Sequence, residues 1–202
     1  TEVRAHEPDA VYLKDVVARI EANLEGLTIN ALAAAEHCEA ALEREDAGEF
    51  FVASYLSFKS GELERIKPLA EIAQTQTHLL EAIAVGLAWH DWAICGFWAE
   101  KFISAKQTAI ATVGLFCFNA HKVALPMNFG DLLLRSLNES KPIELPLLLS
   151  IARKNNDVTI IPMLQQHKVS KELGEFQYEQ LKTRLKLGDQ SALLHLKAFV
   201  LN

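Results

Sequence analysis

The stretch Val85-Gly86-Leu87 recurs as Val113-Gly114-Leu115, 28 residues further along the chain. Each copy lies in an apolar, alanine-rich segment, and a short polar break follows each one. A repeat of this length corresponds to one helical hairpin, which cannot bury its apolar face alone. The pattern therefore predicts an all-α fold of stacked antiparallel helical hairpins, an α-solenoid. We expect both glycines to lie where neighbouring helices approach too closely for a side chain.

Helical spacing of apolar residues extends over nearly the whole chain, and no segment shows the alternation of a strand. The expected helices cover residues 9–24, 28–46, 49–59, 62–74, 77–89, 91–103, 104–119, 128–137, 142–154, 157–167, 170–187 and 189–201. Gly26 is expected to end the first of them. Asp91 and Ser104 are expected N-caps, because their side chains accept N–H bonds of a first helical turn. Pro162 should kink or shorten its helix.

The length of 202 residues suits one domain with a well-buried core, and a hydrophobic content of 50% argues against disorder. Residues 1–202 are therefore expected to form a single helical repeat domain. Within it, we expect N-terminal helices in residues 1–60, core repeats in 61–125 and C-terminal repeats in 126–202. The helices between residues 77 and 118 are apolar almost all round, which is typical of helices with neighbours on several sides.

Several features indicate a cytoplasmic protein. No stretch reaches the roughly 18 uncharged apolar residues of a membrane span, and the chain does not open like a signal peptide. The three cysteines, Cys38, Cys95 and Cys117, lie in apolar helical contexts, where we expect reduced core thiols. The chain opens on Thr1 and ends on an apolar run, so we expect the natural protein to extend further.

The net charge of −6 conceals an asymmetry along the chain. Residues 1–101 carry 18 acids and 8 bases, whereas residues 102–202 carry 8 acids and 12 bases. Phosphates require basic neutralisation, so the acidic first half argues against nucleic acid as its ligand. The acidity favours either a basic partner or simple solubility.

The acidic side chains gather most clearly on one expected helix face. Glu36, Glu39, Glu43 and Asp46 lie within about 80° of one another at 100° per residue. With Glu49, they form the expected partner-binding surface, and a solvated helix face is the alternative. A metal site is not expected, because the matching Glu-x-x-His ligand sets are missing. No cofactor is expected either.

Candidate chemistry elsewhere is sparse. His78 and Glu81 form a single potential ligand pair without a second copy. Trp89, Trp92 and Trp98 lie close together and have the rings to stack on a base, but their apolar neighbours favour core packing. No phosphate-binding loop, nucleophile elbow or metalloprotease motif occurs. We therefore expect no catalytic residues and a non-enzymatic protein.

Four short segments within roughly residues 10–120 carry a family resemblance: Ala22–Leu27, Gly48–Ala53, Ser60–Glu62 and Ala84–Trp89. In these segments the chain resembles HEAT-like repeat proteins of Gram-negative bacteria, often encoded in type VI secretion loci. The C-terminal third keeps the helical style but departs from that pattern. The resemblance implies a HEAT-like solenoid and carries over no catalytic residue.

What the resemblance implies is a cytoplasmic immunity protein that binds and neutralises a cognate secreted toxin. Many such toxins are nucleases, whose phosphate-gripping surfaces are basic and would match an acidic stripe. Two other functions stay open at this point. One is an adaptor or chaperone that loads the effector for secretion. The other is a HEAT-like DNA glycosylase, which needs a basic concave surface. The sequence indicates no oligomeric state.

Overall fold

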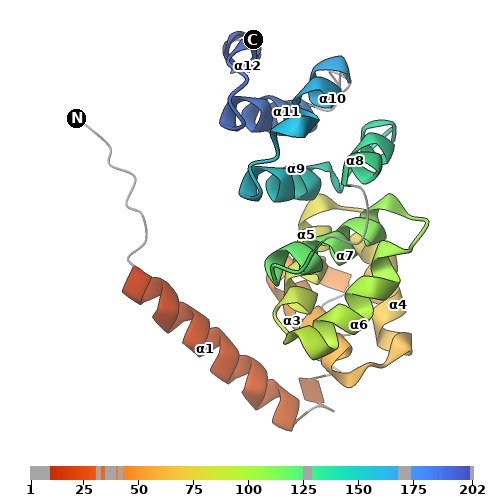
Figure 1. The fold of residues 1–202 in the computed structure, drawn as a ribbon. Coiled ribbons are helices and arrows are strands. Elements are labelled where there is room, and N and C mark those ends of the chain that lie inside the picture. Colours follow the sequence, from red (N-terminus) through yellow and green to blue (C-terminus); the bar gives the residue numbers. More distant parts are fainter. Residues whose placement is uncertain are drawn as a thin grey trace.

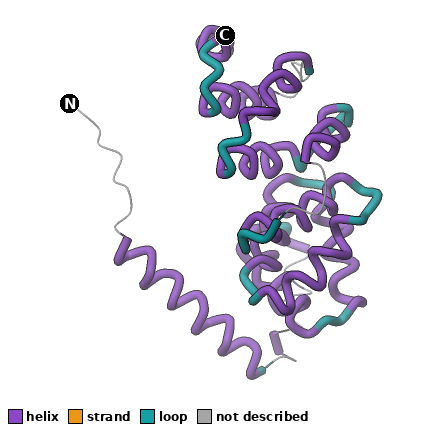
Figure 2. The backbone as a smooth tube through the Cα atoms, viewed as in Figure 1, coloured by secondary structure: helices purple, strands orange, loops and turns teal. Residues whose placement is uncertain are grey.

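The fold was analysed in a computed structural model that describes residues 10–30, 33–34, 40, 43–124, 129–167 and 174–200. Throughout these residues the chain is helical and forms no strand, so the all-α prediction is confirmed for them (Figures 1 and 2). The helices are α1 (Ala10–Ile29), α3 (Ala47–Ser60), α4 (Leu63–Ala73), α5 (Thr77–Ala88), α6 (Trp92–Ile103), α7 (Thr108–Ala120), α8 (Phe129–Leu137), α9 (Leu145–Lys154), the 3-10 turn η1 (Val158–Ile160), α10 (Ile161–Gln166), α11 (Gly174–Lys186) and α12 (Ser191–Val200).

Two of the predicted helix boundaries are confirmed. The carboxylate of Asp91 accepts a hydrogen bond from the backbone N–H of Ile94 at 3.1 Å, so this residue caps α6. Pro162 lies in the first turn of α10, where a missing N–H costs little. The predicted helix over residues 157–167 is accordingly divided into η1 and the short α10.

Two other predicted boundaries are wrong. Helix α1 continues through Gly26 to Ile29, because a glycine in a helix interior costs only about 1 kcal/mol and does not by itself break the helix. Ser104 follows the end of α6 instead of starting α7, and its hydroxyl donates back to the carbonyl of Glu100 at 3.3 Å. Helix α7 begins four residues later, at Thr108.

Alternate helices pack on one another through the molecule. Helix α3 packs against α5, α5 against α7, α7 against α9, and α9 against α11. Helix α4 packs against α3 and α5, α6 packs mainly against α7, and α8 contacts both α7 and α9. Helix α1 contacts α3, and Figure 1 shows most of its length standing apart from the other helices.

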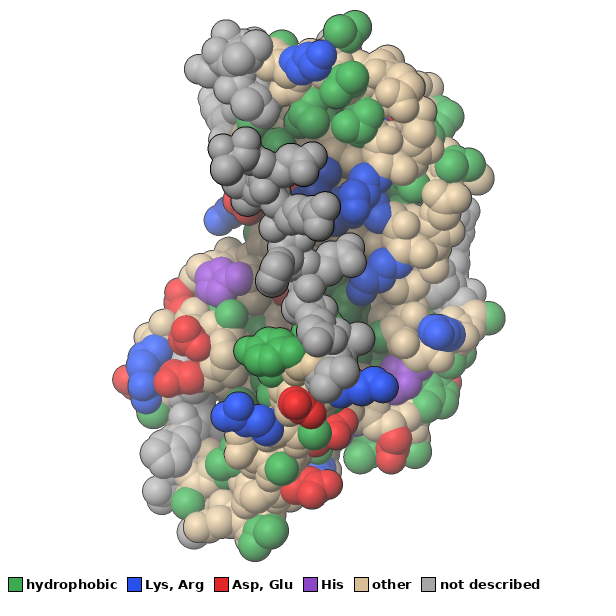
Figure 3. Space-filling model, turned by 90° about the vertical axis from the view of Figure 1, so that its left-hand side faces the viewer, with side chains coloured by type: hydrophobic (Ala, Val, Ile, Leu, Met, Phe, Trp, Pro, Cys, Tyr) green, Lys and Arg blue, Asp and Glu red, His purple; other side chains and the backbone are tan. Residues whose placement is uncertain are grey.

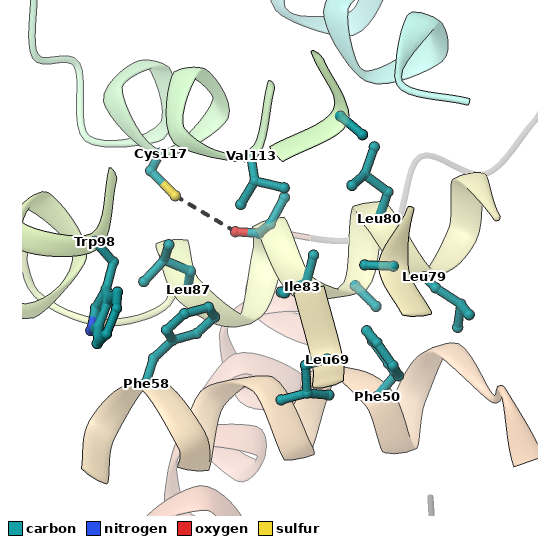
Figure 4. Close-up of a cluster of buried hydrophobic side chains, with 14 of the residues drawn as sticks. Phe50, Phe58, Leu69, Leu79, Leu80, Ile83, Leu87, Trp98, Val113 and Cys117 are labelled. Carbon is teal, nitrogen blue, oxygen red and sulfur yellow. Dashed lines mark hydrogen bonds between the residues drawn. The ribbon is translucent and has the colours of Figure 1, made fainter. Parts of the chain in front are cut away.

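The largest hydrophobic cluster is centred on α5 (Figure 4). Leu79, Leu80, Ile83 and Leu87 of this helix have no exposed surface. Figure 4 shows them between the aromatic rings of α3 and the side chains of α7. Because burying each such leucine contributes about 2 kcal/mol, α5 anchors the first half of the fold.

Gly86 and Gly114 both lie at close helix contacts, as the repeat predicts. A Cβ on Gly86 would approach the carbonyl oxygen of Phe51 in α3 to 2.9 Å. A Cβ on Gly114 would come within 2.7 Å of both Ala99 O and Ile103 N in α6. The two glycines therefore serve the same purpose against different neighbours, so the 28-residue echo does not mark equivalent contacts.

A second hydrophobic cluster joins α7 to α8, α9, α10 and α11. Its residues include Ala111 and Leu115 of α7, whereas Val113 and Cys117 of the same helix belong to the first cluster. Helix α7 thus packs into both clusters. In the described part of the chain, no helix is long and apolar enough to cross a membrane.

Candidate functional site

The predicted acidic surface is described from Glu43 onward, and Glu36 and Glu39 lie outside the described residues. Asp46 is the N-cap of α3, where its Oδ1 accepts the backbone N–H groups of Gly48 at 2.9 Å and Glu49 at 3.1 Å. This carboxylate therefore satisfies the first turn of the helix and also favours its positive end. Glu43 is exposed to solvent.

Glu49 is half-buried and has a local partner. Its Oε1 pairs with Nη1 of Arg44 at 2.9 Å, while its Oε2 is buried without a hydrogen bond. Because Arg44 itself is well exposed, this pair contributes little to stability. Of the three described acids predicted to bind a partner, Glu43 is exposed, Asp46 caps α3, and Glu49 pairs with Arg44.

Sequence reasoning missed Glu45, which links this region to the next helical pair. Its backbone has a φ of 53°, and its side chain accepts a hydrogen bond from Gln76. The ring Nε2 of His78 donates to the carbonyl of Glu45 at 3.1 Å. We call residues 43–49 the acidic turn. These two bonds fix it to the beginning of α5.

His78 also lines a polar cavity of about 570 Å³ where the start of α5 approaches α9 and α11. Three acids line this polar cavity, namely Glu81, Glu175 and Glu179. Three bases line it as well, namely Lys141, Arg153 and Lys182. The expected pair of His78 and Glu81 is therefore part of a larger polar site, assembled with segments about 60 to 100 residues further along the sequence.

The charges of the polar cavity are unevenly paired. Glu179 receives Arg153 Nη1 at 2.9 Å and Lys182 Nζ at 2.8 Å. Burial alone raises the pKa of Glu179, but these two hydrogen-bonded cations outweigh it and leave the pKa below its usual value. Both of these bases are thus engaged, whereas Lys141 has no such role in holding Glu179.

Glu81 has the opposite behaviour. Loss of water around its carboxyl raises the pKa, and the nearby carboxylates of Glu179 and Glu175 raise it further. A carboxylate in this position is stabilised by any cation that enters the cavity. The lysines and the arginine of the lining equal its acids in number, so only the surroundings of Glu81 itself favour a positively charged group.

A second cavity, of about 780 Å³, lies between the ends of α7 and α9. Two residues after the end of each helix, the backbone has a positive φ, 56° at Lys122 and 51° at Asn156. Asn155 Nδ2 donates to Asn119 Oδ1 at 2.9 Å and ties the two ends together. The cavity is thus a product of two similar helix ends, and its lining has no clustered charge.

The three tryptophans are buried to different degrees, and each packs against another aromatic ring. Trp98 is buried, and the ring of Trp92 packs edge-on against Phe118 at 5.1 Å between centroids. Trp89 packs edge-on against Phe51 at 5.5 Å. The prediction of core packing is confirmed for Trp98, whereas Trp92 is half-buried against the first cluster and Trp89 is half-buried.

The buried thiols Cys95 and Cys117 are free, and Cys38 lies outside the described residues. A hydrogen bond to Cys95 and burial raise the pKa of Cys117 well above its usual range, so its thiol is unreactive. Over the residues that are described, no group of His, Cys, Asp and Glu side chains is placed to hold a metal ion.

The surface charges separate along the molecule. On the face in Figure 3, acidic side chains gather over the lower part, where Figure 1 places α1 and α3 to α7. Lysine and arginine side chains occur over both parts, whereas acidic side chains are scarce over the upper part, which α9, α11 and α12 form. The asymmetry between residues 1–101 and 102–202 is therefore also a spatial one.

Comparisons with models of protein families, with curated proteins and with solved structures found no match.

Proposed function

We propose that this protein is a HEAT-like α-solenoid that acts as a binding scaffold for another protein. The stacking of α3, α5, α7, α9 and α11 supports this proposal. A repeated contact supports it too: Nε2 of His90 donates to the carbonyl of Tyr55 at 2.9 Å, and Nε2 of His121 donates to that of Ala88 at 3.1 Å. In each case a histidine just after one helix donates to a carbonyl of the helix two places earlier, inside α3 at Tyr55 and at the last residue of α5, Ala88.

The partner surface is assigned to the acidic turn together with the adjoining polar cavity. The observation that carries this assignment is His78, which bonds the acidic turn through Glu45 and lines the polar cavity beside Glu81. A lysine or arginine of a partner that enters the cavity relieves the mutual repulsion of Glu81, Glu175 and Glu179. Exposed acids around it, such as Glu43, speed the approach of a basic surface.

The biological role that we propose is that of an immunity protein, which binds a secreted antibacterial toxin and blocks its active site or substrate path. Its support is the resemblance in the first 120 residues and the acidity of the same half. A toxin that is a nuclease suits this role best, because its substrate-binding surface is basic. Binding of that surface to the acidic turn would exclude the nucleic acid.

The test is deletion of the gene in its native host. We expect producing cells to poison one another on contact, and the same deletion in a secretion-deficient background to be harmless. If the deletion instead abolishes toxin delivery to competitors without harming the producer, the protein is an adaptor. An unaffected producer that still delivers toxin contradicts the immunity role.

The assigned surface is tested by complementing that deletion. The double variant Glu43→Lys and Glu175→Lys reverses two exposed acids of the surface and is expected to lose protection. The matched control, Glu71→Lys with Glu100→Lys, makes the same change at two exposed acids on α4 and α6 and should protect normally. Equal protection by both variants would remove the acidic turn and polar cavity from the proposal.

A further inference from the structure

Two of the cysteines lie across from each other on neighbouring helices. Cys95 is in the first turn of α6, and Cys117 is in the last turn of α7. The two helices are joined by residues 104–107 and pack closely on each other, so they form an antiparallel hairpin. In such a hairpin, the first turn of one helix lies beside the last turn of the other.

Contacts on both sides of the two cysteines fix this register. Towards the open end of the hairpin, the ring of Trp92 packs against that of Phe118 at 5.1 Å between centroids. Towards the loop, a Cβ on Gly114 would come within 2.7 Å of the carbonyl oxygen of Ala99. The cysteines lie between these two contacts, one just after Trp92 in α6 and the other just after Gly114 in α7. The helices therefore touch where the cysteines are.

The two thiols are in contact and closed off from solvent. Neither Cys95 nor Cys117 has any exposed surface. The thiol of Cys95 forms a hydrogen bond with that of Cys117, whose Sγ donates in turn to the carbonyl of Ala84 in α5 at 4.0 Å (Figure 4). A disulfide needs two Cα atoms about 4.4 to 6.8 Å apart, which is a separation found where helix backbones approach closely. The hairpin therefore places the two thiols as a disulfide requires.

We propose that Cys95 and Cys117 are a modification site, at which an oxidant that is itself a disulfide joins α6 to α7 through a disulfide bond. One cysteine, as the thiolate, attacks the S–S bond of the oxidant and releases one of its sulfurs as a thiol. The other cysteine then attacks this mixed disulfide and releases the second sulfur as a thiol. One S–S bond is formed and one is broken. The cysteines lose two electrons and two protons, and the oxidant takes up both.

The bond forms before the hairpin closes. In the folded protein, the hydrogen bond to Cys95 and burial raise the pKa of Cys117, so the attacking thiolate is scarce and the oxidant is excluded. While α6 and α7 are apart, both thiols have ordinary reactivity. Once the helices pack, the same burial protects the bond from reductants. The folded protein therefore keeps the redox state in which it folded, with α7 either free or tied to α6.

Refolding of the whole chain from urea in a mixture of reduced and oxidised glutathione tests the proposal. Trypsin cleaves after Lys101 and Lys106 and so separates the two cysteines into different peptides. We expect mass spectrometry without reductant to find these peptides joined, with a mass about 2 Da below their sum. The midpoint of thermal unfolding should lie roughly 5 to 10 °C above that of the reduced chain, because the bond closes a loop in the unfolded state.

Two variants identify the pair. Cys117→Ala should lose both the joined peptides and the rise of the thermal midpoint, whereas Cys38→Ser changes the third cysteine and should keep both. In the parent chain, oxidation in urea should be at least about tenfold faster than oxidation of the folded protein. Equal rates would contradict formation before the hairpin closes.

The peptide map of the parent chain decides the proposal without any variant. Refolded protein in which Cys95 and Cys117 carry free thiols or glutathione, or in which one of them is joined to Cys38, contradicts the pairing. A joined pair that lowers the thermal midpoint shows that the closed hairpin does not accommodate the bond, and this result also overturns the proposal.

Discussion

Helices α3 to α7 and helices α9 to α12 are held together in different ways. The first group packs through apolar side chains and through glycines that let backbones touch, as at Gly86 and Gly114. Its buried hydroxyls bond within their own helices, for example Thr112 to the carbonyl of Thr108 at 2.9 Å. Apart from the bonds of His90 and His121 to carbonyls of the helix two places earlier, apolar shape therefore decides which neighbours these helices take.

The second group depends on polar bonds between helices. Buried Gln180 of α11 donates to the carbonyls of Leu164 and His167 at 2.8 and 2.7 Å. Arg184 of α11 pairs with Asp189 at 2.8 Å, and both side chains are almost fully buried. This difference predicts that the stability of the first half depends most on the volume of its side chains. The stability of the second half depends most on their charge.

The largest expected effect is overpacking at Gly114. Replacement by leucine drives a side chain into the backbone of α6, where Ala99 O and Ile103 N leave no room. We expect the free energy of unfolding to fall by at least about 3 kcal/mol. Urea denaturation followed by circular dichroism measures it.

Gly26→Ala is the matched control for that variant. A Cβ at this position meets no atom within 4 Å, and the residue lies inside exposed α1. Stability should rise by up to about 1 kcal/mol, because alanine favours the helix. A Gly114→Leu protein as stable as the parent would show that the contact between α6 and α7 is not tight.

The next largest effect is expected at Asp189, which joins three helices. Its carboxylate accepts hydrogen bonds from Arg184, Gln165 and Ser191. Removing it in Asp189→Ala leaves the guanidinium of Arg184 buried without its partner and should cost about 3 kcal/mol. Asp157→Ala is the control, because Asp157 also follows a helix end and accepts a hydrogen bond from the next turn, at Thr159. This variant loses only a helix cap, which should cost about 1 kcal/mol.

The same carboxylate predicts a loss of stability in acid. Although burial opposes ionisation, the bonds from Ser191, Gln165 and Arg184 hold the pKa of Asp189 well below its usual range. The folded state therefore binds this proton less readily than the unfolded state. The contribution is complete above the ordinary pKa of an aspartate and is lost as the pH falls below it. Asp189→Ala should lack this part of the acid dependence in denaturation curves recorded at several pH values.

The smallest expected effect concerns Glu144, the buried carboxyl at the start of α9. Both carboxyl oxygens of Glu144 are buried without a hydrogen-bond partner, and burial raises the pKa of this carboxyl. The folded state therefore favours the protonated acid, and stability falls as the pH rises from the ordinary pKa of a glutamate through the raised one. Glu144→Gln should remove this fall and stabilise the protein by about 1 kcal/mol above neutral pH. Glu100→Gln, at an exposed site, should leave the stability unchanged. An unchanged stability in Glu144→Gln would contradict a buried carboxyl with a raised pKa at this position.

The first half could be predicted well from the sequence, because its helices are specified by local signals. Apolar spacing located α5, α6 and α7 to within a few residues, and the glycines marked two close contacts. The prediction from sequence failed where a local rule allows two helix boundaries equally well. A serine such as Ser104 suits the end of one helix as well as the start of the next. Which helix Gly86 or Gly114 contacts depends on how the helices pack in three dimensions, which the local sequence does not specify.

The candidate site could be predicted only in part. The predicted acidic surface includes Glu43, Asp46 and Glu49. That Asp46 caps α3 and that Glu49 pairs with Arg44 can be seen only in the structure. The polar cavity brings His78 and Glu81 beside residues of α9, about 70 positions away, and of α11, about 100 positions away. No spacing rule connects such distant segments, since their proximity follows from how the helices stack.

Hydrogen exchange of the native protein, resolved by helix, tests the contrast between the two halves most directly. At neutral pH, the amides of α5 and α7 should exchange most slowly, because they open only with the apolar core. After correction for intrinsic rates, acidification to about pH 3 should reduce the protection of α11 and α12 and leave that of α5 and α7 nearly unchanged. Equal protection in all four helices, falling together in acid, would contradict the account.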